Sequence, residues 1–281
     1  KWPEFLDSLN WPVQQQIVTI FNEPNHAKEW GGQIDPQEYA RFLSIMIQEF
    51  KSRDTKFYIL NAGLDQAAGN TASTLGEEGF LRWMAVEEPD IFNKLDGWAS
   101  HSYPNHGFVG SAKDTGKASI SGYLWELDYL GQLGLSKDLP VFITETGWPH
   151  KEGVKTNNSF YNGDRVARLT GEAFSIWEND DVVRAVTPFV YSYPVEPFDH
   201  FSWVKENGEY YPQTESLTAI SKIAGLPEQE KDYVLKQVEL ADILPTNYLY
   251  KGRIVVQNTG QWIMGERESF AVPMESSPSG I

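Results

Sequence analysis

Five short apolar segments recur along the first part of the chain at nearly constant spacing. They begin at residues 17, 56, 97, 140 and 185, so that successive starts are 39, 41, 43 and 45 residues apart. Each segment is too short for a buried helix and has the composition of a strand covered on both faces. A stretch with helical periodicity follows each of the first four, and such alternation predicts parallel βα units. The expected fold class is therefore α/β.

The elements expected from this pattern can be given by residue ranges. The expected strands are residues 17–21, 56–61, 97–103, 140–144 and 185–191. A helix is expected to begin at Pro36, which follows the capping residue Asp35. The further expected helices are residues 1–10, 77–86, 121–133 and 164–179.

Four of the five strands run into a residue followed by proline. These dipeptides are Glu23-Pro24, Tyr103-Pro104, Trp148-Pro149 and Tyr193-Pro194. Proline cannot donate to a strand ladder and keeps the preceding residue extended, so each one ends its strand. Glu23 is thus expected at the last position of a buried strand. In parallel α/β proteins the chemistry lies at the carboxyl ends of the strands, where these side chains are expected to gather.

A second carboxylate follows the same rule. The apolar strand at residues 141–144 runs directly into Glu145, three strands after Glu23. Two carboxylates at one edge of a parallel sheet can face each other across a cleft. Glycoside hydrolysis requires such a pair, because one group gives a proton to the leaving oxygen and the other attacks or activates water. The alternative is two unrelated carboxylates at strand ends.

Here the sequence resembles glycoside hydrolase clan A, whose members are retaining enzymes on a (β/α)8 TIM barrel. The resemblance rests on Asn-Glu-Pro-Asn at residues 22–25 and Ile-Thr-Glu-Thr-Gly-Trp at residues 143–148. It implies that Glu23 is the acid/base, that Glu145 is the nucleophile and that Asn22 binds the sugar 2-hydroxyl. His101 and Tyr103 match the His-x-Tyr motif of the clan's sixth strand, whose Tyr contacts the nucleophile. The second motif is similar to β-1,3-glucanases and the first to β-xylosidase-like members, so the subfamily stays open.

Other residues near the strand ends are candidates for binding substrate. The hydrogen-bonding and stacking candidates are Asn25, His26, Trp148, Tyr193 and Trp203. Core packing is the alternative explanation for each ring, and loop exposure is the alternative for the histidine. Asn61 and Asp65, after the second strand, lie on the same edge by topology.

The expected mechanism separates the two carboxylates by their pKa values. Carboxylates about 5 Å apart in a retaining site cannot both ionise freely. We therefore expect Glu145 to be ionised in the free site and Glu23 to be protonated until the glycosyl-enzyme forms.

The domain organisation follows from the strand count and from a change in composition. The resemblance implies that the five strands correspond to strands four to eight of the barrel, and the first three are expected to lie outside this chain. Residues 1–225 are expected to be the partial barrel domain, and residues 226–281 a linker with a small β-rich, Ig-like and incomplete module. In that module, Asn258-Thr259-Gly260 predicts a hairpin turn between residues 253–256 and 262–264.

Composition excludes several classes of function. There are 39 acidic and 23 basic residues, a net charge of -16, which argues against binding nucleic acid or an anionic membrane. Without cysteine, the chain has no disulfide framework, thiolate nucleophile or Cys-type zinc site. No apolar segment approaches the roughly 20 residues of a membrane span. The histidines lack a metal-ligand spacing, so neither a metal nor another cofactor is expected.

These observations together favour a retaining glycoside hydrolase that cleaves β-glycosidic bonds of a polysaccharide or oligosaccharide. The expected partner is the carbohydrate substrate, and the expected location is extracellular or at the cell surface. A non-catalytic carbohydrate-binding or scaffold relative of the same fold is the alternative. A metal-dependent hydrolase is a third reading, which a chelator would reveal.

Overall fold

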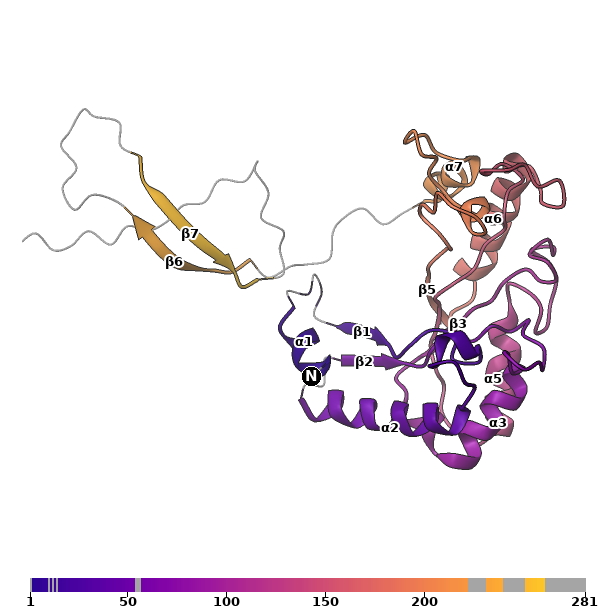
Figure 1. The fold of residues 1–281 in the computed structure, drawn as a ribbon, viewed down its shortest axis with the longest axis horizontal. Helices are drawn as coiled ribbons and strands as arrows, with labels where there is room; N and C mark the ends of the chain where they lie inside the picture. Colours follow the sequence, from indigo (N-terminus) through magenta and orange to yellow (C-terminus); the bar gives the residue numbers. More distant parts are fainter. Residues whose placement is uncertain are drawn as a thin grey trace, which may run out of the picture. The chain divides into compact units, whose positions relative to one another are not determined.

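The computed structural model describes residues 2–9, 11, 13, 15–53, 57–221, 231–239 and 251–260 (Figure 1). The chain divides into two compact units. The larger is Gln15–Ile223, and the smaller combines Lys1–Gln14 with Ala224–Ile281. No helix among the described residues has both the length and the apolar character needed to cross a membrane.

The larger unit contains five parallel strands. They are β1 (Gln16–Thr19), β2 (Phe57–Leu60), β3 (Trp98–Ser100), β4 (Val141–Ile143) and β5 (Val183–Val186). β1 pairs with β2, and β4 lies between β3 and β5. An isolated parallel bridge between Leu60 and Gly97 connects β2 to the residue before β3. Neighbours in sequence are therefore neighbours in space, which confirms the α/β class, although the described residues do not form a complete barrel.

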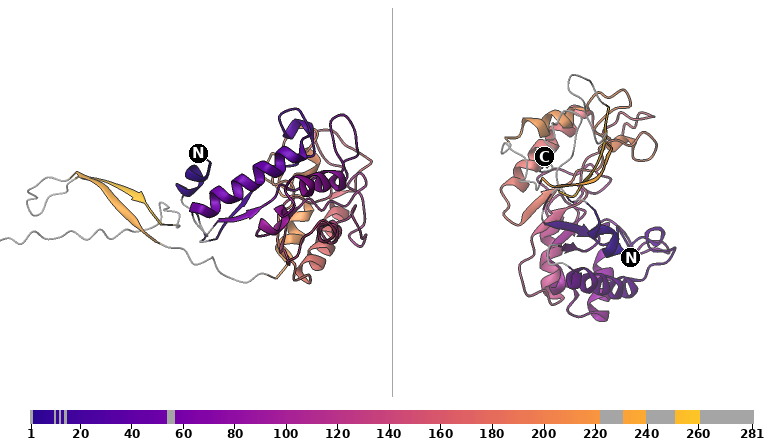
Figure 2. Two further views of the ribbon diagram at one scale, coloured as in Figure 1. Left: turned by 90° about the horizontal axis from the view of Figure 1, so that it is seen from below. Right: turned by 90° about the vertical axis from the view of Figure 1, so that its left-hand side faces the viewer.

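Helices follow the strands in sequence. They are η1 (Ala27–Glu29), α2 (Pro36–Arg53), α3 (Glu77–Glu87), α4 (Ile91–Lys94), α5 (Gly122–Gln132), α6 (Gly163–Glu178), η2 (Asp199–Phe201) and α7 (Pro212–Ala219). α2 begins as the sequence indicates, because the Asp35 carboxylate accepts a hydrogen bond from the Glu38 amide at 2.8 Å. Figure 2 shows α2, the long purple helix, running alongside β1 and β2.

One buried tyrosine connects α2 to the carboxyl ends of the first two strands. The Tyr39 hydroxyl donates to the Ile20 carbonyl at 3.1 Å and accepts from the Ala62 amide at 2.6 Å. These bonds satisfy two backbone groups just beyond β1 and β2, where the ladder has ended. The segment that leads to Glu23 is thereby held against the helix layer.

Three expected strands differ from the structure. β3 ends at Ser100, three residues before Tyr103, which was expected to close it. β1 ends at Thr19 and is half-exposed, with Ile17 41% accessible. The expectation that Glu23 closes a strand buried on both faces is therefore wrong. The physical reason is that β1 has one pairing partner, β2, among the described residues, and is an edge strand. β5 ends at Val186 rather than residue 191, although the Thr187 amide still donates to the Ile143 carbonyl at 2.8 Å.

The smaller unit contains α1 (Trp2–Asp7) and an antiparallel pair, β6 (Tyr233–Glu239) and β7 (Arg253–Asn258). β7 includes the strand expected at residues 253–256. Its expected partner at residues 262–264 lies outside the described residues, and the partner observed is β6.

Candidate active site

Glu23 lies in a loop that continues beyond β1. The Ile20 amide donates to Leu60 and the Glu23 amide to Gly63, so the loop still follows the chain after β2. Phe21 and Glu23 have φ values of +72° and +40°, in the left-handed region that residues other than glycine rarely adopt. This turn places the Glu23 carboxylate at a cavity.

Glu145 follows β4 after one intervening residue. The Thr146 hydroxyl donates to the Ser102 carbonyl at 2.7 Å and fixes the chain after Glu145 to the chain after β3. Gly147 has a φ of +146°, and a Cβ there would lie 3.2 Å from the Phe189 carbonyl oxygen. Glycine therefore permits the close approach of the chain after β5.

A buried histidine lies between the two carboxylates. His101 Nδ1 is 2.9 Å from Glu23 Oε1 and 3.8 Å from Glu145 Oε2, and its side chain is 1% exposed. The Tyr103 hydroxyl donates to Glu145 Oε2 at 3.0 Å. One potential ligand atom of each of Glu23, His101 and Glu145 lies within 4.8 Å of the other two. Two carboxylates and an imidazole can also bind a metal ion, so this cluster is compatible with the alternative of a metal-dependent hydrolase.

The pKa shifts of the two carboxyl groups differ from those expected. Burial raises the pKa of Glu23, but the hydrogen bond and charge of His101 outweigh it and leave the pKa lowered. Burial raises the pKa of Glu145, and the nearby Glu23 adds to this effect, against His101 and Tyr103, which lower it; the net pKa is raised. Burial lowers the pKa of His101, but Glu23 and Glu145 outweigh it and raise the pKa overall. The order of the two pKa values is thus the reverse of the expected one, with Glu23 below Glu145.

The carboxylates open into a cavity of about 490 Å³ with two chemically different walls. The polar wall consists of Asn22, Glu23, His26, Lys28, Glu29, Asp65 and Glu145, and the apolar wall of Tyr103, Phe108, Phe160, Phe189, Pro197, Phe198 and Phe201. Aromatic rings facing a few polar groups are typical of small-molecule sites.

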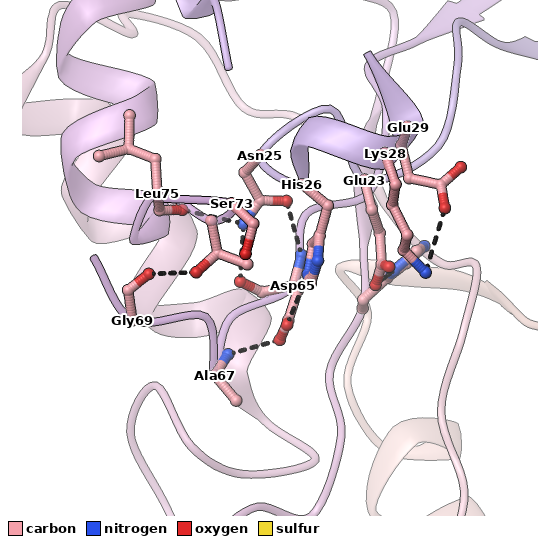
Figure 3. A network of polar contacts seen from close by, with 12 residues as sticks. Glu23, Asn25, His26, Lys28, Glu29, Asp65, Ala67, Gly69, Ser73 and Leu75 are labelled. Carbon is pink, nitrogen blue, oxygen red and sulfur yellow. Dashed lines mark hydrogen bonds and ion pairs between the residues drawn. The ribbon is translucent and has the colours of Figure 1, made fainter. Parts of the chain in front are cut away.

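Polar contacts link residues of the polar wall (Figure 3). His26 Nε2 lies 2.8 Å from Asp65 Oδ2, which joins the loop after β1 to the loop after β2. Lys28 Nζ lies 3.3 Å from Glu29 Oε1. The polar lining of the cavity therefore contains nitrogen groups of His26 and Lys28 as well as carboxylates.

The structure brings most of the sequence-predicted site residues together. Asn22, Glu23, His26, Tyr103 and Glu145 line the cavity, and His101 lies against both carboxylates. Asp65 also lines it, whereas Asn61 is buried and donates to the Ala99 carbonyl at 3.0 Å.

Four other candidates lie elsewhere. Asn25 is fully buried, and its amide donates to the Asp65 and Leu75 carbonyls. Trp148 is buried and donates from its indole to the Gly110 carbonyl at 2.8 Å. Tyr193 lines a separate cavity, and Trp203 does not line the cavity at Glu23 and Glu145. Their assignment to substrate binding stays a prediction.

Sequence reasoning missed the aromatic wall and part of the polar one. Phe108 lies in the long loop after β3, and Phe198 and Phe201 lie at η2, far from any strand end. Lys28 and Glu29 follow the Asn-Glu-Pro-Asn motif after two intervening residues, and that proximity was the signal that could have identified them.

Comparison of the sequence with protein-family models and with curated proteins finds no match. Among solved structures, the chain is similar to a GH128 (subgroup II) endo-beta-1,3-glucanase from Sorangium cellulosum. The identity is 14%, the similarity covers 74% of this chain and 71% of that one, and the TM-score is 0.52. A second GH128 (subgroup II) endo-beta-1,3-glucanase, from Pseudomonas viridiflava, has 17% identity over 73% of this chain and 70% of its own, with a TM-score of 0.49. The first similarity shows that the chain shares the fold of a glycoside hydrolase barrel enzyme.

Proposed function

We propose that this chain is a retaining glycoside hydrolase that cleaves β-glycosidic bonds in a polysaccharide or oligosaccharide. The observation that carries the proposal is the Glu23–His101–Glu145 cluster, in which oxygens of the two carboxylates lie within 4.8 Å of each other. Retaining enzymes have carboxyl groups about 5–5.5 Å apart, whereas inverting enzymes need about 6.5–9.5 Å to admit water.

The reaction proceeds in two displacements. Glu145 attacks the anomeric carbon, and an ester bond forms as the bond to the leaving oxygen breaks. Glu23 gives its proton to that oxygen. Glu23 then takes a proton from water, the water oxygen attacks the anomeric carbon, and the ester bond breaks to regenerate Glu145.

The proposed roles need the proton on Glu23 and the negative charge on Glu145 in the first displacement. The pKa of Glu23 is lowered and that of Glu145 is raised, so the proton must be shared against this order. Because His101 Nδ1 contacts both carboxylates, the three groups titrate together. We assign the transfer of a proton to Glu23 to this shared system. Tyr103 then stabilises the charge on Glu145 by its hydrogen bond.

The first polymer to test is a β-1,3-glucan. The Sorangium cellulosum protein that shares the fold is an endo-beta-1,3-glucanase, and the aromatic wall of the cavity offers rings for stacking on sugars. Such a substrate lies outside cells, so we place the protein in the extracellular space or at the cell surface. In this proposal residues 1–225 belong to a (β/α)8 barrel of clan A, and residues 226–281 form a linker and a small β-rich module.

The test uses aryl β-glycosides and a β-1,3-glucan with the wild-type chain, Glu145→Ala and Glu23→Ala. Both substitutions should abolish most turnover. Azide should restore the variant without the nucleophile and give a glycosyl azide of inverted configuration. If Glu145→Ala gives the inverted glycosyl azide, Glu145 is the nucleophile, as proposed. If Glu23→Ala gives it instead, Glu23 is the nucleophile and the two roles must be exchanged.

Two other results would replace the proposal. Binding of oligosaccharide without turnover in any variant would indicate a carbohydrate-binding relative. Turnover that disappears with a chelator and returns with a divalent cation would indicate a metal-dependent hydrolase.

A further inference from the structure

We propose that a second cavity, beside the catalytic one, binds a further sugar unit of the same substrate chain, with Tyr193 as its stacking surface. This inference rests on the proposed function and deepens it. It concerns residues 191–211, the segment after β5. The proposed mechanism assigns this segment no role beyond the aromatic residues that it contributes to the catalytic cavity.

The second cavity has the size and the chemistry of a sugar site. Its volume is about 340 Å³, at the lower end of the range of roughly 300–1,000 Å³ for small-molecule sites. Tyr193, Tyr211, Asp199, Ser202 and Lys205 are among its lining residues. Rings with neighbouring carboxylate, hydroxyl and ammonium groups match the apolar faces and hydroxyl edges of a pyranose.

The wall between the two cavities is a short stretch of chain. Tyr193 and Pro194 line the second cavity, and Pro197 and Phe198 line the catalytic one. The rings of Tyr193 and Phe198 pack edge-to-face with centroids 5.5 Å apart. A substrate that leaves the catalytic cavity over Phe198 therefore meets the Tyr193 ring next.

Tyr193 is held in place at its backbone while its ring stays accessible. The Tyr193 amide donates to the Ser202 hydroxyl at 2.9 Å, and that hydroxyl donates to the Tyr193 carbonyl at 3.0 Å. The residue is 36% exposed. A fixed aromatic ring at a cavity loses little conformational entropy when a ligand stacks on it.

Asp199 fixes another part of the lining of this cavity. Its carboxylate oxygen Oδ2 accepts from the Val154 amide at 2.6 Å, and both residues line the cavity. The loop at Val154 is thereby held in place beside η2.

The test measures the affinity of β-1,3-gluco-oligosaccharides of increasing length by titration calorimetry in a Glu145→Gln background, which prevents hydrolysis. Affinity should rise with length and then level off. Adding Tyr193→Ala should reduce the gain from the added length about tenfold, as expected for the loss of one ring contact. Tyr193→Phe should keep the gain, because stacking needs only the ring. Tyr191→Ala is the matched control, since Tyr191 is 70% exposed and lines neither cavity.

Two results would overturn the inference. One is a gain with length that Tyr193→Ala leaves intact. The other is an equal loss for the shortest and the longest ligands, which would mean that Tyr193 acts only through Phe198 on the catalytic cavity. Neither result depends on turnover. A wild-type chain that binds these oligosaccharides but hydrolyses none would refute the proposed function, while the dependence of affinity on oligosaccharide length would still test the second site.

Discussion

The imidazole of His101 lies 2.9 Å from the Glu23 carboxylate and is almost completely buried. A charged hydrogen bond at this distance is short enough to outweigh the cost of burial. The same nitrogen is 3.8 Å from Glu145. One side chain therefore influences the charge of both proposed catalytic groups.

His101→Asn should shift the pH profile of kcat/KM toward higher pH on both sides. His101 lowers the pKa of Glu23 and also that of Glu145, so both values rise when it is removed. Because the pKa of Glu23 is the lower of the two in the free site, the acid limb of the profile follows Glu23 and the alkaline limb follows Glu145. Rates measured with an aryl β-glycoside across the pH range check this. An unshifted profile with a lower maximum would mean that His101 only supports the fold.

Tyr103→Phe should lower kcat about 10- to 100-fold, because a hydrogen bond to a charged group contributes roughly 1.5–3 kcal/mol. The Tyr103 hydroxyl lowers the pKa of Glu145, which is the higher of the two carboxyl pKa values, so the alkaline limb should move to higher pH while the acid limb stays in place. This single-sided shift separates Tyr103 from His101. A loss in KM alone would contradict a role at the nucleophile.

Gly63→Ala should displace His101 and reduce activity strongly. A Cβ at Gly63 would overlap the His101 ring, which is buried and has no room to withdraw. Gly69→Ala is the matched control, because a Cβ there meets no atom within 4 Å. Thermal unfolding and kcat/KM are measured for both variants. Equal, small effects of the two substitutions would show that the space around His101 does not constrain catalysis.

The stability of the protein should fall as pH rises above the ordinary Glu pKa of 4.5. Glu77 on α3 and Glu126 on α5 are fully buried, and burial raises both pKa values. Each carboxyl is more easily protonated in the folded than in the unfolded chain. The stabilisation is therefore complete below the unfolded pKa and is lost as pH rises through the folded value.

Glu126→Gln should make this loss smaller, because it removes one buried charge and its repulsion of Glu77. Urea unfolding at a series of pH values measures the slope. Glu78→Gln is the control: Glu78 is exposed and pairs with Arg82 at 2.9 Å, an arrangement that contributes little. Parallel slopes for wild type and Glu126→Gln would contradict the prediction.

The sequence predicted the order of the elements and the meeting of Glu23 with Glu145. Both came from local signals: apolar segments about 40 residues apart, and carboxylates just after the segments at residues 17–21 and 141–144. Because the strands are parallel, residues that follow them lie at the same edge of the sheet, independently of the conformation of the loops.

The remaining features depend on contacts that a linear pattern does not contain. Trp148 follows a strand end just as Glu145 does, yet its indole finds the Gly110 carbonyl and it is buried. Asn25 lies inside the recognised motif but forms hydrogen bonds with two loop carbonyls. The pKa order of the carboxylates was reversed because His101 lies closer to Glu23 than to Glu145, a tertiary distance.

The left-handed backbone at Phe21 and Glu23 lowers the stability of the protein in exchange for the position of the Glu23 carboxylate. Each such residue costs on the order of 1–3 kcal/mol of folding free energy. Replacing Phe21 with glycine would relax the backbone, but it would also remove a ring that packs on Trp30 and Phe42. A substitution that stabilises the protein by relaxing this turn would also displace the Glu23 carboxylate. Searches for thermostable variants should therefore begin elsewhere in the chain.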